Sequence, residues 1–146
     1  MRFVAVKNVE QQDIQAIHRV RAECITHRTA KSNQIRGLVT EYGLVAAHRS
    51  AALRAAIPCW LEDAENGLTS QFRALLHGLW EDLIRLDERV TSLDADIALI
   101  AKTDPVAKRL QQLRGVGPLI ATALVASVGT GEQYAKGRQM AAALTG

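Results

Sequence analysis

The chain has 146 residues, the size of one ordinary domain, and its 48% of hydrophobic residues excludes a wholly disordered chain. With 18 basic and 15 acidic side chains it is only mildly basic, and its 4% of aromatic residues are too few for a base-stacking RNA platform. No apolar run reaches about 18 residues, so we expect no membrane partner, and Cys24 and Cys59 cannot build a disulfide framework. These features favour a reduced, cytoplasmic, soluble protein.

The first half of the sequence predicts one long and one short helix. Asn8 and Gln11 fit a capping box that opens a helix from about Val9 to Tyr42, where Gly43 can supply a left-handed C-cap. A weaker helix over Ser50–Ile57 is expected to stop at Pro58. The acidic stretch that follows, 62–67, is typical of a turn.

The segment Phe72–Ala101 carries the strongest periodic signal. Its apolar residues follow alternating spacings of four and three, which predicts a coiled-coil helix. The seam consists of Phe72, Leu76, Leu79, Leu83, Leu86, Val90, Leu93, Ile97 and Ile100.

Asp104 and Pro105 then predict a new N-cap and first helical position, opening a short helix to Leu113. A glycine-rich turn and a helix over Pro118–Val128 follow. A loop at 129–134 and the start of another helix at 139–144 complete the predicted elements.

Charge is distributed unevenly along the chain. From Ile14 to Leu61 there are seven Lys or Arg and two acidic residues, whereas from Glu62 to Asp96 there are nine acidic and three basic residues. The two long helices should therefore attract each other as an antiparallel pair, with Leu86 buried in the seam, although a dimer of two such hairpins stays open. The predicted fold class is all-α: a long antiparallel coiled-coil helical hairpin followed by a helix-hairpin-helix unit.

The segment Leu113–Val125 has the pattern of a helix-hairpin-helix. In this motif a Gly-Val-Gly turn exposes backbone N–H groups to a DNA phosphate, and glycine avoids a Cβ that would block the approach. The alternative is a tight corner between two helices with glycine at the bend. The candidate DNA-binding residues are Lys108, Arg109, Arg114, Gly115, Val116, Gly117 and Ile120.

The first helix carries a second set of candidate nucleic-acid contacts: Arg21, Arg28, Lys31 and Arg36. Such a stripe could follow a phosphate backbone. The alternative is a solvated face that pairs with the acidic helix.

No catalytic or metal-binding constellation is predicted. The carboxylates between Glu62 and Asp96 point in diverging directions on a helix, whereas a two-metal nuclease needs them to converge. The four histidines have no metal-ligand spacing, and no Ser or Cys lies in a nucleophile motif.

Several stretches resemble the IS-one-ten family of insertion-sequence transposases, in the order in which the family has them. They are Arg2 to Gln12, His27-Arg28-Thr29, Asn33 to Leu38, Glu41-Tyr42-Gly43, Leu110 to Gly129 and Gly137 to Ala142.

The resemblance implies a DNA recombinase of three parts: an RuvC-like domain with an Mg²⁺-binding acidic tetrad, an oligomerising coiled coil, and a C-terminal domain with a serine nucleophile. It also implies an element-encoded guide RNA. This chain is expected to hold an inter-domain linker at 1–8, the coiled-coil region at 9–103, and the N-terminal part of the transposase domain at 104–146. Neither the tetrad nor the serine is expected in it, and so no cofactor is expected either.

The sequence therefore predicts a truncated, DNA-binding transposase segment, catalytically incompetent alone, associated with the nucleoid in the bacterial cytoplasm and forming a homo-oligomer. The alternative is a coiled-coil oligomerisation or regulatory module that pairs with full-length transposase. A helix-hairpin-helix repair protein would fit 105–129 but leaves Arg2–Tyr42 unexplained.

Overall fold

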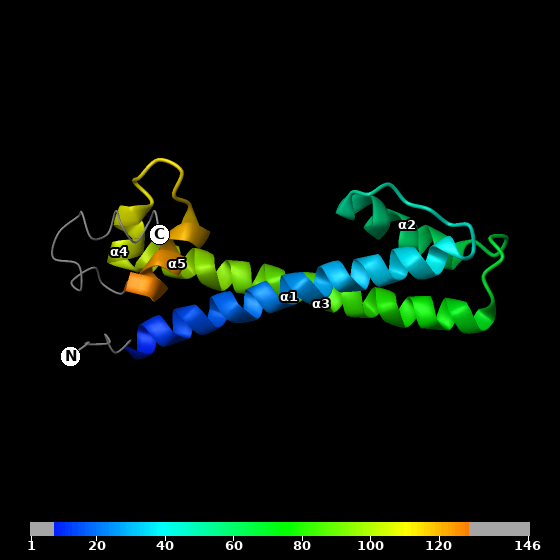
Figure 1. Ribbon diagram of the computed structural model, residues 1–146, viewed down its shortest axis with the longest axis horizontal. Coiled ribbons are helices and arrows are strands. Elements are labelled where there is room, and N and C mark those ends of the chain that lie inside the picture. Colours follow the sequence, from blue (N-terminus) through cyan, green and yellow to red (C-terminus); the bar gives the residue numbers. More distant parts are fainter. Residues whose placement is uncertain (1–7, 129–146) are drawn as a thin grey trace, which may run out of the picture. The chain divides into compact units, whose positions relative to one another are not determined.

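The computed structural model describes residues 8–128, which form five helices and, within that range, no strand (Figure 1). The all-α fold class is confirmed. The predicted linker, apart from Asn8, and the predicted elements at 129–134 and 139–144 lie outside the described residues. The helices are α1 (Val9–Thr40), α2 (Ser50–Glu62), α3 (Ser70–Thr103), α4 (Pro105–Leu110) and α5 (Pro118–Val128).

The chain divides into two compact units. The hairpin unit contains residues 8–22 and 91–128 of the described range, and the three-helix unit contains residues 23–90. The helices α1 and α3 each contribute a segment to both units. No helix of the described range is long and apolar enough to span a bilayer.

The core of the three-helix unit is built from α1, α2, α3 and the connection before α3. The rings of Tyr42 and Phe72 lie at its end, with centroids 4.3 Å apart. Burial of these apolar side chains is the main term that stabilises the unit. The buried cluster consists of Ile35, Val39, Leu53, Ile57, Leu68, Phe72, Leu76 and Leu83.

Ion pairs link the helices of the three-helix unit. Arg28 of α1 lies 3.5 Å from Asp87 of α3, and Lys31 lies 3.9 Å from Asp82. Arg54 of α2 binds both oxygens of Asp87, at 2.6 and 2.7 Å. Because later residues of α1 pair with earlier residues of α3, these segments run antiparallel, with the basic helix against the acidic one as the charge pattern predicts.

The heptad seam of α3 is only partly buried. Leu83 is fully buried and Val90 is 4% exposed, but Leu86 between them is half-buried, so its predicted burial is wrong. The opposing seam positions of α1 hold Arg28 and Lys31. These long side chains extend toward the carboxylates of α3 and therefore do not cover Leu86 as apolar residues would.

The predicted end of the second helix at Pro58 is also wrong, because α2 continues to Glu62. Proline removes one hydrogen bond from a helix interior. Burial of Leu53 and Ile57 on one face of α2 offsets this loss, and Arg73 of α3 supports the last turn by donating to the carbonyl oxygens of Trp60 and Leu61 at 3.0 and 3.1 Å.

The predicted start of α1 is correct, whereas the predicted ends of α1 and α4 lie two and three residues too late. The capping box is confirmed: the amide of Gln11 donates to Asn8 Oδ1 at 2.7 Å, and the amide of Asn8 donates to Gln11 Oε1 at 3.1 Å. Helix α1 ends at Thr40 rather than Tyr42, because the turn that leads into Gly43, with φ of +78°, begins earlier. Helix α4 ends at Leu110 rather than Leu113, since the next amides bond in tight turns.

Candidate nucleic-acid interface

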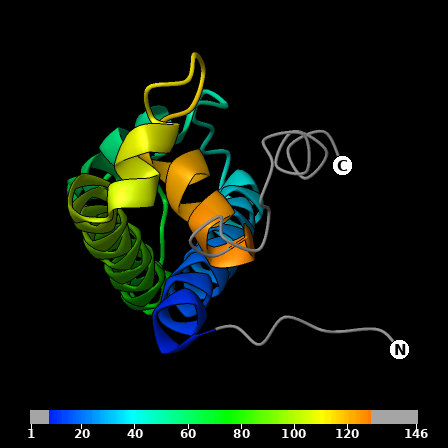
Figure 2. The same ribbon diagram turned by 90° about the vertical axis from the view of Figure 1, so that its left-hand side faces the viewer.

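The segment predicted to form a helix-hairpin-helix rests on a core of its own in the hairpin unit. Figure 2 shows α5 (orange) beside the first turns of α1 (blue), with α4 (yellow) beside the end of α3. Val116 in the turn packs on this core while the glycines on either side of it are exposed. The buried residues are Ile14, Ala107, Leu110, Ala121, Val125 and Ala126.

Two polar residues fix α4 in place. The carboxylate of Asp104 accepts hydrogen bonds from the amides of Val106 and Ala107, both at 2.9 Å, which confirms the predicted N-cap. The side-chain amide of Gln111 donates to Ala101 at 2.8 Å and to Ala107 at 3.0 Å. The start of the hairpin is thereby tied to the end of α3.

The turn between α4 and α5 needs glycine at one position and leaves space at another. Gly115 has φ of +82°, a left-handed conformation that glycine adopts without strain. Gly117 precedes α5, and its carbonyl accepts the Ala121 amide at 2.9 Å. Apart from its two chain neighbours, no heavy atom of the described structure lies within 4 Å of the position that a Cβ on Gly117 would take.

The predicted DNA-binding residues lie along this one hairpin. Lys108 and Arg109 occupy the last turn of α4, and they and Arg114 are exposed. Ile120 is 48% exposed in the first turn of α5. The amide of Val116, which the sequence predicts to face a phosphate, instead donates to the Leu113 carbonyl at 3.2 Å. The amides of Leu119 and Ile120 are in the first turn of α5 and have no helical acceptor, so the surface combines N–H donors with positive charge.

The candidate cations of α1 have partners within the protein. Arg21 lies 2.6 Å from Asp94, and Arg28 and Lys31 pair with α3 as described above. Arg36 donates to the carbonyl oxygens of Ala46, His48 and Arg49, each at 3.1 Å. These contacts agree with the alternative given above, in which the basic face of the first helix pairs with other parts of the protein. Contacts of these residues to nucleic acid stay a prediction.

Sequence reasoning missed the polar contacts that hold α5 on α1. The Nε2 atom of His18 lies 2.9 Å from the hydroxyl of Thr122, which is fully buried. The same hydroxyl also donates within α5, to the carbonyl oxygens of Pro118 at 2.9 Å and Leu119 at 3.2 Å. Gln11 adds a longer contact of 3.5 Å to the Val125 carbonyl. Residues over 100 positions apart give no local signal for such pairing.

The burial of His18 should make the stability of the protein depend on pH. Burial lowers the pKa of His18 below 6.5, and the charge of Arg21 lowers it further. The unfolded chain therefore binds a proton at a pH where the folded chain does not. Stability from this source is complete above about pH 6.5 and is lost as the pH falls through the lower pKa of the folded state.

The free energy of unfolding of the wild type should decrease between about pH 7.5 and pH 5.5. We expect this decrease to be smaller in the His18→Gln variant. Urea unfolding at the two pH values measures it. The exposed His48 provides the control variant His48→Gln, which should keep the wild-type decrease. An unaltered pH dependence in His18→Gln would contradict this assignment.

A small cavity adjoins the hairpin. It has a volume of about 330 Å³, and two lysines, Lys102 at the end of α3 and Lys108 of α4, lie in its wall. Lys102 was not among the predicted site residues, because the periodicity of α3 says nothing about which residues adjoin α4. The lining residues are Ala98, Ala101, Lys102, Lys108, Gln111 and Pro118.

Within residues 8–128, no group of three or more His, Cys, Asp or Glu side chains is placed to hold a metal ion. The carboxylates of α3 that the structure brings into contact with other helices are bound to arginine or lysine. The described surface thus offers donors and cations rather than a carboxylate cluster.

Comparison with known proteins gives a consistent answer. A transposase for an insertion sequence element of Coxiella burnetii is 37% identical over 97% of this chain, which covers 39% of that protein. A probable family 20 transposase of Pseudomonas aeruginosa is 38% identical over 97% of the chain, and 42% of it is covered. A Yersinia enterocolitica transposase for an insertion sequence element is 26% identical over the same share.

No protein-family profile and no solved structure matches the chain. The chain spans about two fifths of the length of the curated relatives. The resemblance predicted from the sequence is confirmed: over 97% of its length, this chain is similar to a segment of insertion-sequence transposases.

Proposed function

We propose that this chain is a DNA-positioning segment of an insertion-sequence transposase. The observation that carries the proposal is the exposed Gly115–Gly117 turn, which leads into α5 beside three exposed cations. The similarity to transposases, proteins whose name implies work on DNA, supports duplex DNA as the partner.

The hairpin would hold a phosphate through backbone groups. The amides of Leu119 and Ile120 are available donors, and the positive end of the α5 dipole lies behind them. Gly117 has no side chain, so a phosphate oxygen can come close to these amides. Such contacts position a duplex without reading its bases, so binding should be largely indifferent to sequence.

The three cations would supply the electrostatic part of the affinity. Lys108, Arg109 and Arg114 are exposed, so each can neutralise a phosphate at little desolvation cost. Three contacts are few, and we expect affinity on the order of micromolar or weaker.

We further propose that the chain by itself does not cut DNA. Chemistry would come from other parts of a whole transposase, including the carboxylates that hold Mg²⁺ and the serine nucleophile. An element-encoded RNA would choose the DNA there. The present segment would orient the duplex relative to these parts.

The proposal predicts binding without cleavage. The chain should bind duplexes of unrelated sequence alike, with log K falling against log salt at a slope of about −3. Fluorescence anisotropy measures this slope, and incubation of the same duplexes with Mg²⁺ should yield no cut strands. Absence of binding at low salt would contradict the positioning role, whereas cleavage that survives purification controls would contradict the catalytic part.

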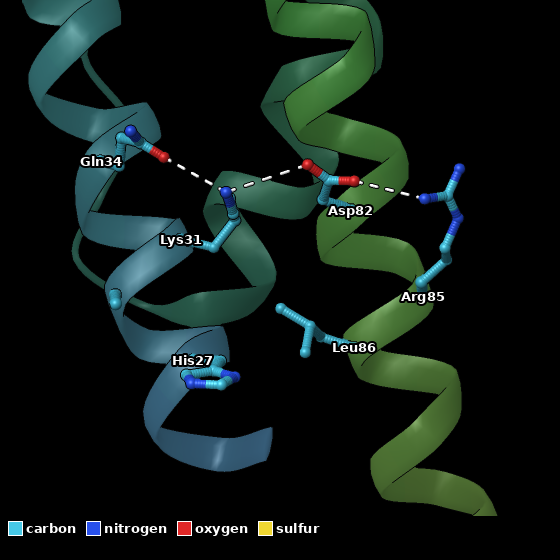
Figure 3. A pocket seen from close by; sticks show the side chains of 7 residues that line it. His27, Lys31, Gln34, Asp82, Arg85 and Leu86 are labelled. Atoms are coloured by element: carbon cyan, nitrogen blue, oxygen red, sulfur yellow. Dashed lines mark hydrogen bonds and ion pairs between the residues drawn. The ribbon is translucent and has the colours of Figure 1, made fainter. Parts of the chain in front are cut away.

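A second candidate function is oligomerisation with further copies or with full-length transposase. The observation that favours it is an open cavity of about 610 Å³ between α1 and α3 in the three-helix unit. Figure 3 shows Leu86 beside this opening, with Lys31 reaching across to Asp82. A stable dimer that is indifferent to DNA in sedimentation experiments would favour this function, and a monomer that binds DNA would favour the first.

A further inference from the structure

A cavity of about 330 Å³ lies between the end of α3, α4 and the start of α5, and of its lining residues only Lys108 has a role in the hairpin contacts described so far. We propose that it is a second phosphate site, in which Lys102, supported by the charge of Lys108, holds one phosphate in addition to the three that the hairpin cations neutralise. This inference rests on the proposed function, and it adds a residue of α3 to the DNA-binding surface.

The charge of the cavity favours an anion. Lys102 and Lys108 come from the last turns of α3 and α4, and both are exposed. Among residues 8–128 neither lysine has an ion-pair partner, and no acidic residue lines the cavity. Asp104, the acid nearest in sequence, is engaged by the amides of Val106 and Ala107. Two ammonium groups beside one cavity repel each other, and a bound phosphate removes this repulsion.

The wall of the cavity is held in place independently of any ligand. Gln111 donates to the carbonyl oxygens of Ala101 and Ala107, which joins α3 to α4 beneath the two lysines. A site that is already formed loses little conformational entropy when it binds.

The cavity is continuous with the hairpin surface. Pro118 lines it, and Pro118 directly follows Gly117, whose Cα lies about 3.8 Å away along the chain. Proline has no N–H to donate, so an anion here depends on the lysines, whereas at the hairpin it depends on backbone amides. A strand bound at Gly117 would therefore lie next to the lining of this cavity.

The lining favours a nucleic-acid backbone over a nucleotide base. Ala98, Ala101 and Pro118 offer no hydrogen-bond donor through their side chains and no aromatic ring on which a base could stack. The cavity can therefore recognise a nucleic-acid backbone only through the charge of its lysines. The site should therefore raise affinity and salt dependence without adding sequence preference.

The proposal changes the expected salt dependence. With four phosphate contacts, affinity should fall about 150-fold between about 50 and 200 mM salt, against about 40-fold for three. Lys102→Ala should reduce the slope by about one unit for all duplexes alike, and Lys102→Arg should restore it. Fluorescence anisotropy with a duplex of arbitrary sequence measures the slope.

Arg89→Ala is the matched control, because Arg89 is an exposed cation of the same helix that lies in the three-helix unit. It should leave the slope unchanged. Inorganic phosphate substituted for chloride at equal ionic strength should not displace the duplex, since one such contact is weak. Circular dichroism should show the same helicity for all variants.

The outcomes separate this inference from the function on which it rests. If the wild-type chain binds DNA and Lys102→Ala keeps its full slope, the second phosphate site is wrong and the hairpin site stands. Displacement by inorganic phosphate would also overturn it, in favour of a site for free anions. If the wild-type chain binds no duplex, the proposed function itself fails.

Discussion

Replacing Leu83 by alanine should lower the free energy of unfolding by about 2–5 kcal/mol. Leu83 has no exposed surface and lies in the cluster that joins α1, α2 and α3. Its truncation removes apolar burial and leaves a cavity that the surrounding helices can only partly close. Urea unfolding followed by circular dichroism measures the loss.

Leu86→Ala is the matched control for this prediction. It is the same substitution three residues further along the same helix, but Leu86 is half-buried and lines an open cavity. Its cost should be about 1 kcal/mol, because less surface is lost and no closed void forms. Equal costs for the two variants would contradict the structure at this point and would show that something covers Leu86 in solution.

Local signals in the sequence predicted helix starts and left-handed glycines well. The Asn8–Gln11 capping box and the Asp104–Pro105 start depend on residues within four positions of each other. Gly43 and Gly115 likewise take the left-handed conformation that their places in turns require. In each case the interacting atoms belong to one short segment, so the local sequence is enough to predict the structure there.

Contacts between distant segments could not be predicted in this way. The continuation of α2 past Pro58 depends on Arg73, which arrives from α3 to bind the carbonyls of the last turn. The partial exposure of Leu86 depends on which α1 side chains oppose it. The heptad pattern gave the correct period, but it does not state how completely a basic helix covers the seam.

The candidate site also has one part that local sequence signals predict and one part that depends on contacts between distant segments. Arg114 to Ile120 could be selected from the sequence because a hairpin is a local motif, and the structure exposes its glycines. The role of the α1 cations was ambiguous, because a basic stripe can bind either nucleic acid or an acidic helix. Only the positions of Asp82, Asp87 and Asp94 in the structure show their partners. Lys102 could be proposed only from the packing of α3 and α4, which places it beside one cavity with Lys108.

Gly117→Val should weaken duplex binding by about 10- to 100-fold. The substitution places a branched side chain where the phosphate would approach the amides of Leu119 and Ile120. Hydrogen bonds to a charged group contribute about 1.5–3 kcal/mol, and losing one such contribution corresponds to this range. Fluorescence anisotropy at low salt measures the change.

The backbone makes Gly117 a cleaner probe than Gly115. Gly115 has φ of +82°, so any side chain there strains the turn itself, whereas the backbone of Gly117 suits other residues and the space around it is open. Valine is a poorer residue than glycine before a helix and should cost the fold only about 1 kcal/mol.

Gly78→Val is the control, because Gly78 is an exposed glycine of α3 with equally open surroundings. It should leave binding unchanged, and Arg114→Ala should weaken all duplexes alike while reducing the salt slope by about one unit. If Gly117→Val keeps normal helicity and binds as tightly as the wild type, the turn is only a corner between α4 and α5. Any DNA contact would then have to come from other cations, and those of α1 would first have to release the carboxylates that hold them.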